Sequence, residues 1–256
     1  MNSAFRLALY QGPSPSGDEA AAYATIERVL KASSAMGADM AVFPEAYLLG
    51  YNLGQMISQP LDGPWIDRLG ALAEQTGIAA VIGLSERDGE TCFNTAVAIG
   101  PDRAIMASYR KIQLWGAREA SVWMPGESYA TFTYRGRTIG LLICYDIEFP
   151  EHVRALVHKG ADLIVVPTAN PQPFDNVNRF AVPARAMENA ISVAYCNYCG
   201  TERDATYCGR SLIAGPEGEP LAMAGNTEAL LIADIPASAD PLDRPTEHLA
   251  DLKVIP

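Results

Sequence analysis

An internal repeat is the feature that most constrains how this chain can fold. The segment GADMAVFP at residues 37–44 recurs as GADLIVVP at residues 160–167, and AIGPD at residues 98–102 resembles IAGPE at residues 213–217. A repeat of about 120 residues is too long for one unit of a solenoid. It predicts instead two similar halves, although Gly-Ala-Asp before an apolar strand is also a common helix-to-strand turn.

Alternating strand and helix patterns predict an α/β layered sandwich. The central strands are continuous apolar runs such as LIVV, which indicates burial on both faces. Each half is expected to run strand–helix–strand–helix–strand–strand, with strands at 7–10 and 139–145 opening the two halves. Helices are expected at residues 19–35, 65–75, 150–158 and 176–189.

No low-complexity linker divides the sequence, so residues 1–256 are expected to form a single domain. A chain of this length buries roughly 70–75% of its unfolded surface and needs no disulfide or metal to hold its core. Residues 236–256 contain four prolines and little periodicity. They are predicted to be an extended C-terminal tail on a surface, and a candidate to cross to a second subunit.

Charge and cysteine content exclude several function classes. The formal net charge of −11 repels phosphate backbones, so nucleic-acid binding is not expected. Five cysteines cannot form a complete intramolecular disulfide framework, which favours reduced thiols in a cytoplasmic protein. Neither a signal-peptide pattern nor an apolar run of 18 residues occurs, so no membrane span is expected.

Cys196 and Cys199 have the two-residue gap of a metal or redox pair, and Cys208 follows nine residues later. A zinc site would need a fourth ligand, and no histidine lies nearby. The pair also sits in a strand-like run rather than at the start of a helix. These thiols are therefore predicted to be inert and buried. Because no glycine-rich phosphate loop occurs either, neither a metal nor a cofactor is expected.

Three residues stand just after apolar runs, where α/β folds place functional groups. Glu45 follows VFP, Lys111 follows the predicted strand 104–108, and Cys144 ends GLLI. Each has a plain structural alternative: a solvated loop carboxylate, a surface lysine and a core cysteine.

The text around these residues resembles a known family. FPE at 43–45, YRK at 109–111 and CYD at 144–146, in this order and spacing, are similar to the three signatures of the nitrilase superfamily of carbon–nitrogen hydrolases. The resemblance implies a Glu-Lys-Cys catalytic set and an α/β fold. That fold is a four-layer α-β-β-α sandwich of two pseudo-symmetric halves, in a homodimer or higher homo-oligomer. The resemblance extends over nearly the whole chain, through LYQG at 9–12, PG at 125–126 and VPTAN at 166–170.

Within the superfamily, the chain resembles the 5-aminopentanamidase and (R)-stereoselective amidase branch. The matching strings are LICYDIEFPE at 142–151, YCNYCG at 195–200 and LAMAG at 221–225. The chain departs from that branch at WGAREASVW, residues 115–123, where the branch has a Phe-led version. Since this loop is expected to border the site, the substrate can differ too.

The resemblance assigns roles to the candidate residues. Cys144 is the expected nucleophile and Glu45 the base, with His152 as the one rival base among three histidines. Lys111 offsets the negative charges and, with the backbone N–H of Tyr145, stabilises the oxyanion. Glu119 stands where many members carry a second active-site glutamate, and its alternative is a helix-surface carboxylate.

A substrate pocket is expected around the nucleophile. Its wall is predicted to include Tyr51, Trp115, Tyr145, Asn170 and Phe174. Glu148 is a candidate partner for a substrate ammonium, or alternatively a carboxylate that only stabilises the N-terminus of the following helix.

The function expected from this set is an amidase. It would hydrolyse a small-molecule amide, such as an amino-acid amide or 5-aminopentanamide, to carboxylate and ammonia through a thioester. The alternatives are a nitrilase, an N-carbamoyl hydrolase and an acyltransferase using the same thioester. A catalytically silent binding subunit is a further alternative, but it predicts loss of a catalytic residue, and all three are present.

Overall fold

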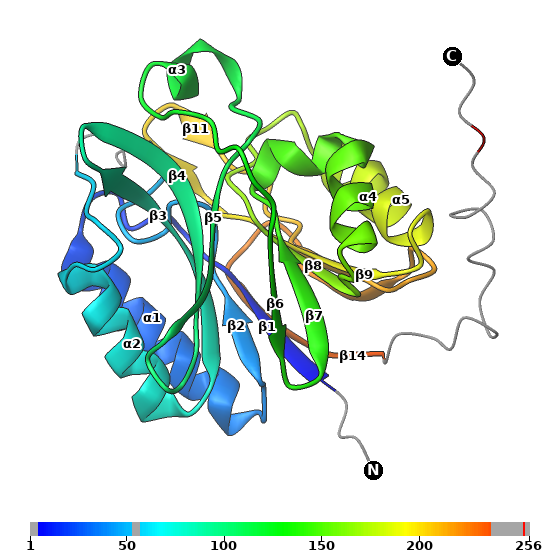
Figure 1. Ribbon diagram of the computed structural model, residues 1–256, viewed down its shortest axis with the longest axis horizontal. Coiled ribbons are helices and arrows are strands. Elements are labelled where there is room, and N and C mark those ends of the chain that lie inside the picture. The colour runs from blue at the N-terminus through cyan, green and yellow to red at the C-terminus, as the bar shows by residue number, and fades with distance from the viewer. Residues whose placement is uncertain (1–4, 53–56, 237–252, 254–256) are drawn as a thin grey trace.

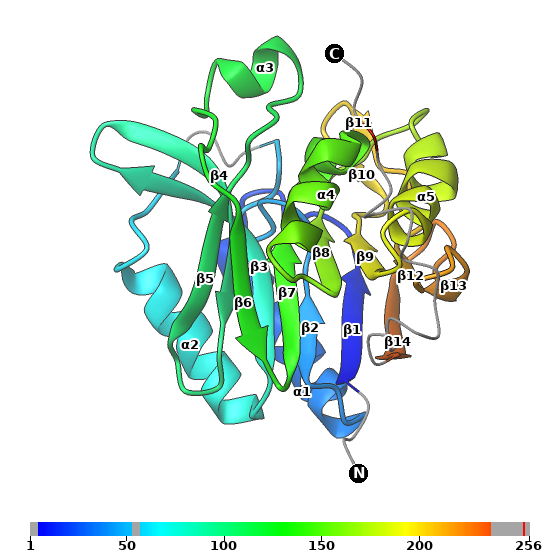
Figure 2. The ribbon, with the colours of Figure 1, turned by 45° about the vertical axis from the view of Figure 1, so that its right-hand side comes forward.

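Two six-stranded sheets stack face to face in the computed structural model, which describes residues 5–52, 57–236 and 253 (Figure 1). The first sheet has the order β14-β1-β2-β3-β4-β5 and the second the order β13-β12-β9-β8-β7-β6. Helices cover the outer face of each sheet, α1 and α2 on the first and α4 and α5 on the second (Figure 2). The fold is therefore the predicted α-β-β-α sandwich.

The strands of the first sheet are β1 (Phe5–Gln11), β2 (Met40–Val42), β3 (Ala79–Asp88), β4 (Thr91–Ile99), β5 (Ile105–Arg110) and β14 (Ala229–Ile235). Those of the second are β6 (Ala130–Tyr134), β7 (Arg137–Leu141), β8 (Leu163–Pro167), β9 (Ser192–Cys196), β12 (Leu212–Ala214) and β13 (Pro220–Met223). A separate hairpin pairs β10 (Thr201–Glu202) with β11 (Ala205–Thr206). The helices are α1 (Glu19–Ala35), α2 (Pro64–Thr76), α3 (Gly116–Ala120), α4 (Pro150–His158) and α5 (Val182–Met187).

The predicted repeat is a structural repeat. The two echoed segments 37–44 and 160–167 contain β2 and β8, the second strand of each half, and the shorter echoes end β4 and β12. In each sheet three parallel strands precede two antiparallel ones. An antiparallel edge strand then completes each sheet beside its first strand, and this is β6 in the second sheet but β14 in the first.

The main core lies between the two sheets, because both present apolar residues inward. Leu9, Val42, Leu141 and Val165 are all fully buried there. A second cluster packs α1 and α2 onto the outer face of the first sheet. The continuous apolar runs of the sequence are thus explained by burial on both faces.

Two predicted elements end differently in the structure. The strand expected to reach residue 145 stops at Leu141, and a 3₁₀ turn over Cys144–Glu148 follows it. The helix expected over 176–189 is a π-helical turn, Val177–Ala181, followed by α5. Pro183 explains the second difference, because it lacks the N–H that would bond the carbonyl of residue 179. The predicted tail at 236–256 lies outside the described residues except at Pro236 and Lys253.

Candidate active site

Four polar side chains meet at one end of the sandwich, three of them just after a strand and one on a short helix. Glu45 follows β2, Lys111 follows β5, Cys144 follows β7, and Glu119 lies on α3. Glu45, Lys111 and Glu119 are essentially fully buried, and Cys144 is half-buried. Buried charges are costly unless paired, so this grouping is not a solvated surface cluster.

Cys144 occupies a strained backbone position at the start of its 3₁₀ turn. Its φ of 47° lies in the left-handed region, which costs free energy for any residue other than glycine. Asp146 holds this turn, because its Oδ2 accepts the backbone N–H of Ile143 at 2.9 Å and the hydroxyl of Tyr109 at 2.8 Å. Its Oδ1 accepts the N–H of Gln113 at 2.8 Å. The CYD motif therefore fixes the cysteine against the segment that carries Lys111.

Lys111 lies between the two glutamates. Its Nζ is 2.7 Å from Oε1 of Glu45 and 2.7 Å from Oε1 of Glu119. Although burial lowers the pKa of Lys111, the negative charges of Glu45, Cys144 and Glu119 raise it, and the net direction is upward. Lys111 is therefore a permanently charged donor at this site.

The two carboxylates differ in how many of their oxygen atoms are occupied. Glu119 accepts from Lys111 and from the hydroxyl of Tyr51 (2.6 Å) at Oε1, and from the N–H of Trp115 (2.7 Å) at Oε2. Glu45 accepts at Oε1 from Lys111 and from Nδ2 of Asn94 at 2.7 Å. Its Oε2 has no hydrogen-bond partner among the described residues. Glu45 thus keeps one oxygen available for a proton, and Glu119 does not.

The environment favours the neutral thiol of Cys144. Burial raises the pKa of this thiol, the nearby Glu45 raises it further, and Lys111 and a hydrogen bond from Thr168 oppose both effects. The net pKa is raised, so the thiolate does not form spontaneously at neutral pH. Burial likewise raises the pKa of Glu45, against the attraction of Lys111. A carboxylate with a raised pKa is a stronger base for the thiol proton.

A cavity of about 230 Å³ opens beside Cys144. All six residues predicted for the substrate pocket line it, and Glu148 is the one charged residue among its lining side chains. They are Tyr51, Trp115, Tyr145, Glu148, Asn170 and Phe174, and Ala169 and Pro171 complete the wall. Trp115 and Phe174 meet edge to face across it, with ring centroids 5.9 Å apart.

Sequence reasoning missed Asn94, which shares Oε1 of Glu45 with Lys111. Asn94 lies within β4, and asparagine is depleted in strands, so its position inside an apolar run was an available signal.

His152, the rival base considered from the sequence, does not line the cavity beside Cys144. It is buried on α4 with Nδ1 2.8 Å from the hydroxyl of Tyr129.

The paired cysteines also have a structural place. Cys196 is buried, and its thiol donates to the backbone carbonyls of Tyr10 (3.2 Å) and Val42 (3.3 Å). Within the described ranges, no group of three or more His, Cys, Asp or Glu residues is arranged to hold a metal ion.

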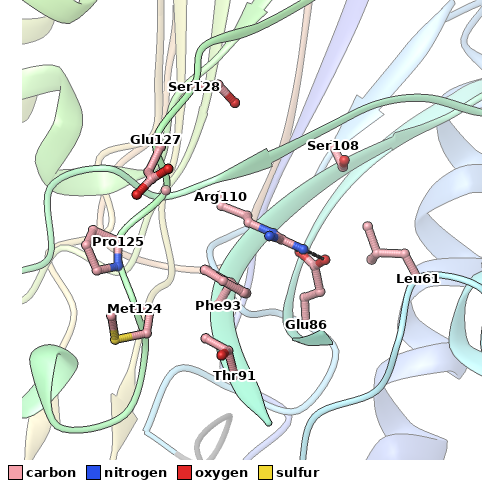
Figure 3. Close-up of a pocket in the computed structure, with 11 residues that line it drawn as sticks. Leu61, Glu86, Thr91, Phe93, Ser108, Arg110, Met124, Pro125, Glu127 and Ser128 are labelled. Atoms are coloured by element: carbon pink, nitrogen blue, oxygen red, sulfur yellow. Dashed lines mark hydrogen bonds and ion pairs between the residues drawn. The ribbon is translucent and has the colours of Figure 1, made fainter. Parts of the chain in front are cut away.

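A larger cavity of about 770 Å³ is lined by residues of β3, β4 and β5 and of the segment 124–128 (Figure 3), and Cys144 is not among its lining residues. Its charged core is already paired. Arg110 bonds both carboxylate oxygens of Glu86, contacts Asp88 at 2.8 Å and lies over the ring of Phe93. The hydroxyl of Thr95 also donates a hydrogen bond to Oε2 of Glu86. Glu127 and several hydroxyl groups also line this cavity, but no cysteine does among the described residues. A thiol beside a carboxylate and a lysine is found at the smaller cavity, so the chemistry is assigned there.

Replacing Lys111 by methionine is expected to destabilise the fold by about 3–5 kcal/mol at neutral pH, because two buried carboxylates lose their counter-charge. Without the lysine, burial holds the folded-state pKa of Glu45 above its unfolded value. Stability is then retained in acid and lost as pH rises through that raised pKa. Urea unfolding at a series of pH values measures the effect.

Lys31→Met is the matched control, since its pair with Glu27 is exposed, and it should cost less than about 0.5 kcal/mol. A Lys111→Met variant as stable as the control at neutral pH would contradict the buried ion pairing.

Comparisons with known proteins agree with this geometry. The family model described as carbon-nitrogen hydrolase matches residues 6–242. An (R)-stereoselective amidase from a Pseudomonas species is 36% identical over 208 residues, which cover 80% of this chain and 75% of the relative. A nitrilase from Pyrococcus abyssi is 36% identical over 213 residues, covering 80% and 79%.

A solved structure of an amidase from Nesterenkonia sp. has a TM-score of 0.88 and 34% sequence identity, and covers 98% of this chain and 97% of that one. Other structures of that amidase contain butyramide or the product of Michael addition of acrylamide at the active site cysteine. No helix within the described part of this chain is both long and apolar enough to cross a membrane.

Proposed function

Because the chain belongs to the carbon–nitrogen hydrolase family and is an enzyme acting on amides, we propose that it hydrolyses a small amide to a carboxylate and ammonia through a thioester on Cys144. One observation carries the proposal: the thiol of Cys144 faces a cavity beside Glu45, whose Oε2 has no hydrogen-bond partner in the described part of the chain. Every group that the reaction requires is then supplied by the chain itself.

Acylation begins with proton transfer from Sγ of Cys144 to Oε2 of Glu45. The sulfur forms a bond to the amide carbonyl carbon, and the carbonyl electron pair moves onto oxygen. Lys111 and the backbone N–H of Tyr145 donate to that oxyanion. Glu45 then gives its proton to the amide nitrogen, the C–N bond breaks, and ammonia leaves a thioester behind.

Deacylation repeats the sequence with water. Glu45 takes a proton from water while the hydroxide forms a bond to the thioester carbon. When the C–S bond breaks, the proton returns to sulfur, and the product is a carboxylic acid that ionises in solution. Glu119 holds Tyr51, Lys111 and Trp115 in place through the hydrogen bonds that it accepts from them.

The pocket favours a substrate that bears an ammonium group. Among the described residues of the wall, Glu148 is the one charged side chain, and lysine, arginine and histidine are absent. Four aromatic residues also line the cavity. Aromatic faces and a carboxylate together stabilise a desolvated cation by a few kcal/mol at most. The net charge of −11 adds attraction at long range.

Glu148→Gln is expected to lower kcat/KM for 5-aminopentanamide by about 10-fold, the loss of one charge-assisted contact. The kcat/KM for pentanamide, which is neutral, should change less than about 3-fold, because that amide has no charge for Glu148 to contact. Steady-state ammonia release with both amides measures the ratio. Glu151→Gln is the control, because Glu151 is exposed on the next helix and does not line the cavity. An equal loss of kcat/KM for both amides would contradict an interaction between Glu148 and the substrate ammonium.

A panel of amides, nitriles and N-carbamoyl compounds tests the activity itself. An amidase releases ammonia from amides, a nitrilase releases it from nitriles, and an N-carbamoyl hydrolase releases carbon dioxide as well. Hydroxamate formation with hydroxylamine would report acyl transfer from the thioester. No turnover on any class would favour a silent binding subunit.

We also propose that the protein forms a homodimer or a larger assembly. Light scattering after size exclusion measures its mass in solution.

A further inference from the structure

Glu202, on the small hairpin β10–β11, is a buried carboxylate that the mechanism above does not use. Only 1% of its surface is exposed. Burying a carboxylate is unfavourable unless hydrogen bonds compensate, so its partners indicate what it holds. The hairpin and α3 lie at the same end of the sandwich (Figure 1).

Two of its hydrogen bonds go to residues 45–52, which we call the active-site segment. Oε2 of Glu202 accepts the backbone N–H of Asn52 at 3.3 Å, and the backbone carbonyl of Glu202 accepts from Nδ2 of Asn52 at 3.0 Å. Asn52 follows Tyr51 directly, and Tyr51 donates to Glu119 at 2.6 Å. Glu202 therefore anchors the end of the segment that bears Tyr51.

The same hairpin also reaches the other end of the active-site segment, through stacked tyrosines. Tyr207 donates to Oε2 of Glu202 at 2.6 Å, and its ring stacks on Tyr198 with centroids 4.8 Å apart. Tyr198 donates to the backbone carbonyl of Glu45 at 2.8 Å and stacks on Tyr47. Both ends of the segment, at Glu45 and next to Tyr51, are thus held by one buried cluster, which consists of Glu202, Tyr207 and Tyr198.

Gly50 shows how closely the two parts fit. Its φ of 100° is one that other residues rarely adopt, and a Cβ there would overlap Oε1 of Glu202. The segment therefore bends where the carboxylate approaches it.

We propose that Glu202 is a positioning residue of the active site. It holds the active-site segment so that Tyr51 stays bonded to Glu119, and Glu119 in turn holds Lys111 beside Glu45 and Cys144. The inference rests on the proposed function for the catalytic roles of Glu45, Lys111, Glu119 and Cys144. A displacement of about 1 Å at a reacting group can cost up to about 10²-fold in rate, so the anchor is expected to matter.

A double-mutant cycle between Glu202→Ala and Tyr51→Phe tests the proposal. Each single change is expected to lower kcat/KM by about 10-fold or more. Because both break the same connection, the double variant should be within about 3-fold of the worse single variant. Glu202→Gln keeps an acceptor oxygen for Tyr207 and Asn52 and should recover most of the activity. The alkylation rate of Cys144 by fluoroacetamide, followed by mass spectrometry, is expected to follow the same pattern.

Glu86→Gln is the matched control, because Glu86 is equally buried but is tied to Arg110 and Thr95 on the outer face of its sheet (Figure 3). It should lower the thermal midpoint, and its effect on activity should multiply with that of Tyr51→Phe. The proposal would be overturned if the losses of kcat/KM from Glu202→Ala and Tyr51→Phe multiplied in the double variant. It would also be overturned if Glu202→Ala alone kept kcat/KM within about 3-fold of wild type.

If Glu202→Ala does not fold, Tyr207→Phe takes its place in the cycle and is judged by the same criteria. The alkylation rates separate this inference from the proposed function. Selective labelling of Cys144 without ammonia release would count against the amidase activity, while the cycle in labelling rates would still decide the role of Glu202.

Discussion

The Cys144→Ala variant is expected to lose amide turnover, with kcat/KM reduced by at least about 10⁴-fold. Alanine removes the atom that forms the thioester, and among the described residues no other thiol lines the cavity. Binding of the amide should survive, because the remaining wall is unchanged.

Ammonia release and intact-protein mass spectrometry together measure this result. Wild type incubated with an amide and quenched in acid should show the acyl adduct, and the variant should show none. Cys92→Ala is the control, since Cys92 is half-exposed and lies outside the cavity. Near-native hydrolysis by Cys144→Ala would show that the nucleophile is another group.

The second large effect is expected at the base, where Glu45→Gln should reduce kcat by about 10²–10⁴-fold. The substitution is well matched to the site. The amide oxygen can accept from Lys111 and Asn94 as Oε1 does, and the new NH₂ takes the place of Oε2, which lacks a partner among the described residues. The fold is therefore kept while the proton acceptor is lost.

The pH profile provides a separate check. Glu45 must be ionised to take the thiol proton, so kcat/KM should fall as pH drops through its pKa. Since burial raises that pKa, the acid limb should lie above the ordinary range of glutamate. The limb should disappear in Glu45→Gln.

Glu119→Gln is the informative contrast, because both oxygens of Glu119 already accept hydrogen bonds. An amide group there must turn its NH₂ toward a donor, so this variant should also unfold at a lower temperature. An unchanged acid limb in Glu45→Gln would assign the base to another residue.

The sequence allowed the layered fold and the site to be predicted for a physical reason. Strands buried on both faces leave continuous apolar runs, and functional groups stand where those runs end, as Glu45 and Cys144 do. The roles of the three motif residues came from family resemblance, and the structure brings Glu45 and Lys111 within 2.7 Å.

Other features depend on contacts that sequence periodicity does not record. The early end of β7 follows from the hydrogen bonds of Asp146, which pull the chain into a turn at Cys144. Asn94 and Glu202 act through partners far along the chain, Glu45 and Asn52. Glu202 has no local pattern that separates it from an ordinary polar residue, and the one local signal at Asn94 is its place inside a strand.

The pairing of β1 with β14 has a consequence for how the chain folds. The second sheet obtains its edge strand β6 from the residues immediately before β7, whereas the first sheet obtains β14 from the far end of the described chain. The Arg6–Asp234 ion pair spans 228 residues. During synthesis the first half therefore waits with an unpaired strand edge until the second half has emerged. Contacts of such long range slow folding, and an open edge invites association with other chains. The half that carries the base can be completed only after the half that carries the nucleophile.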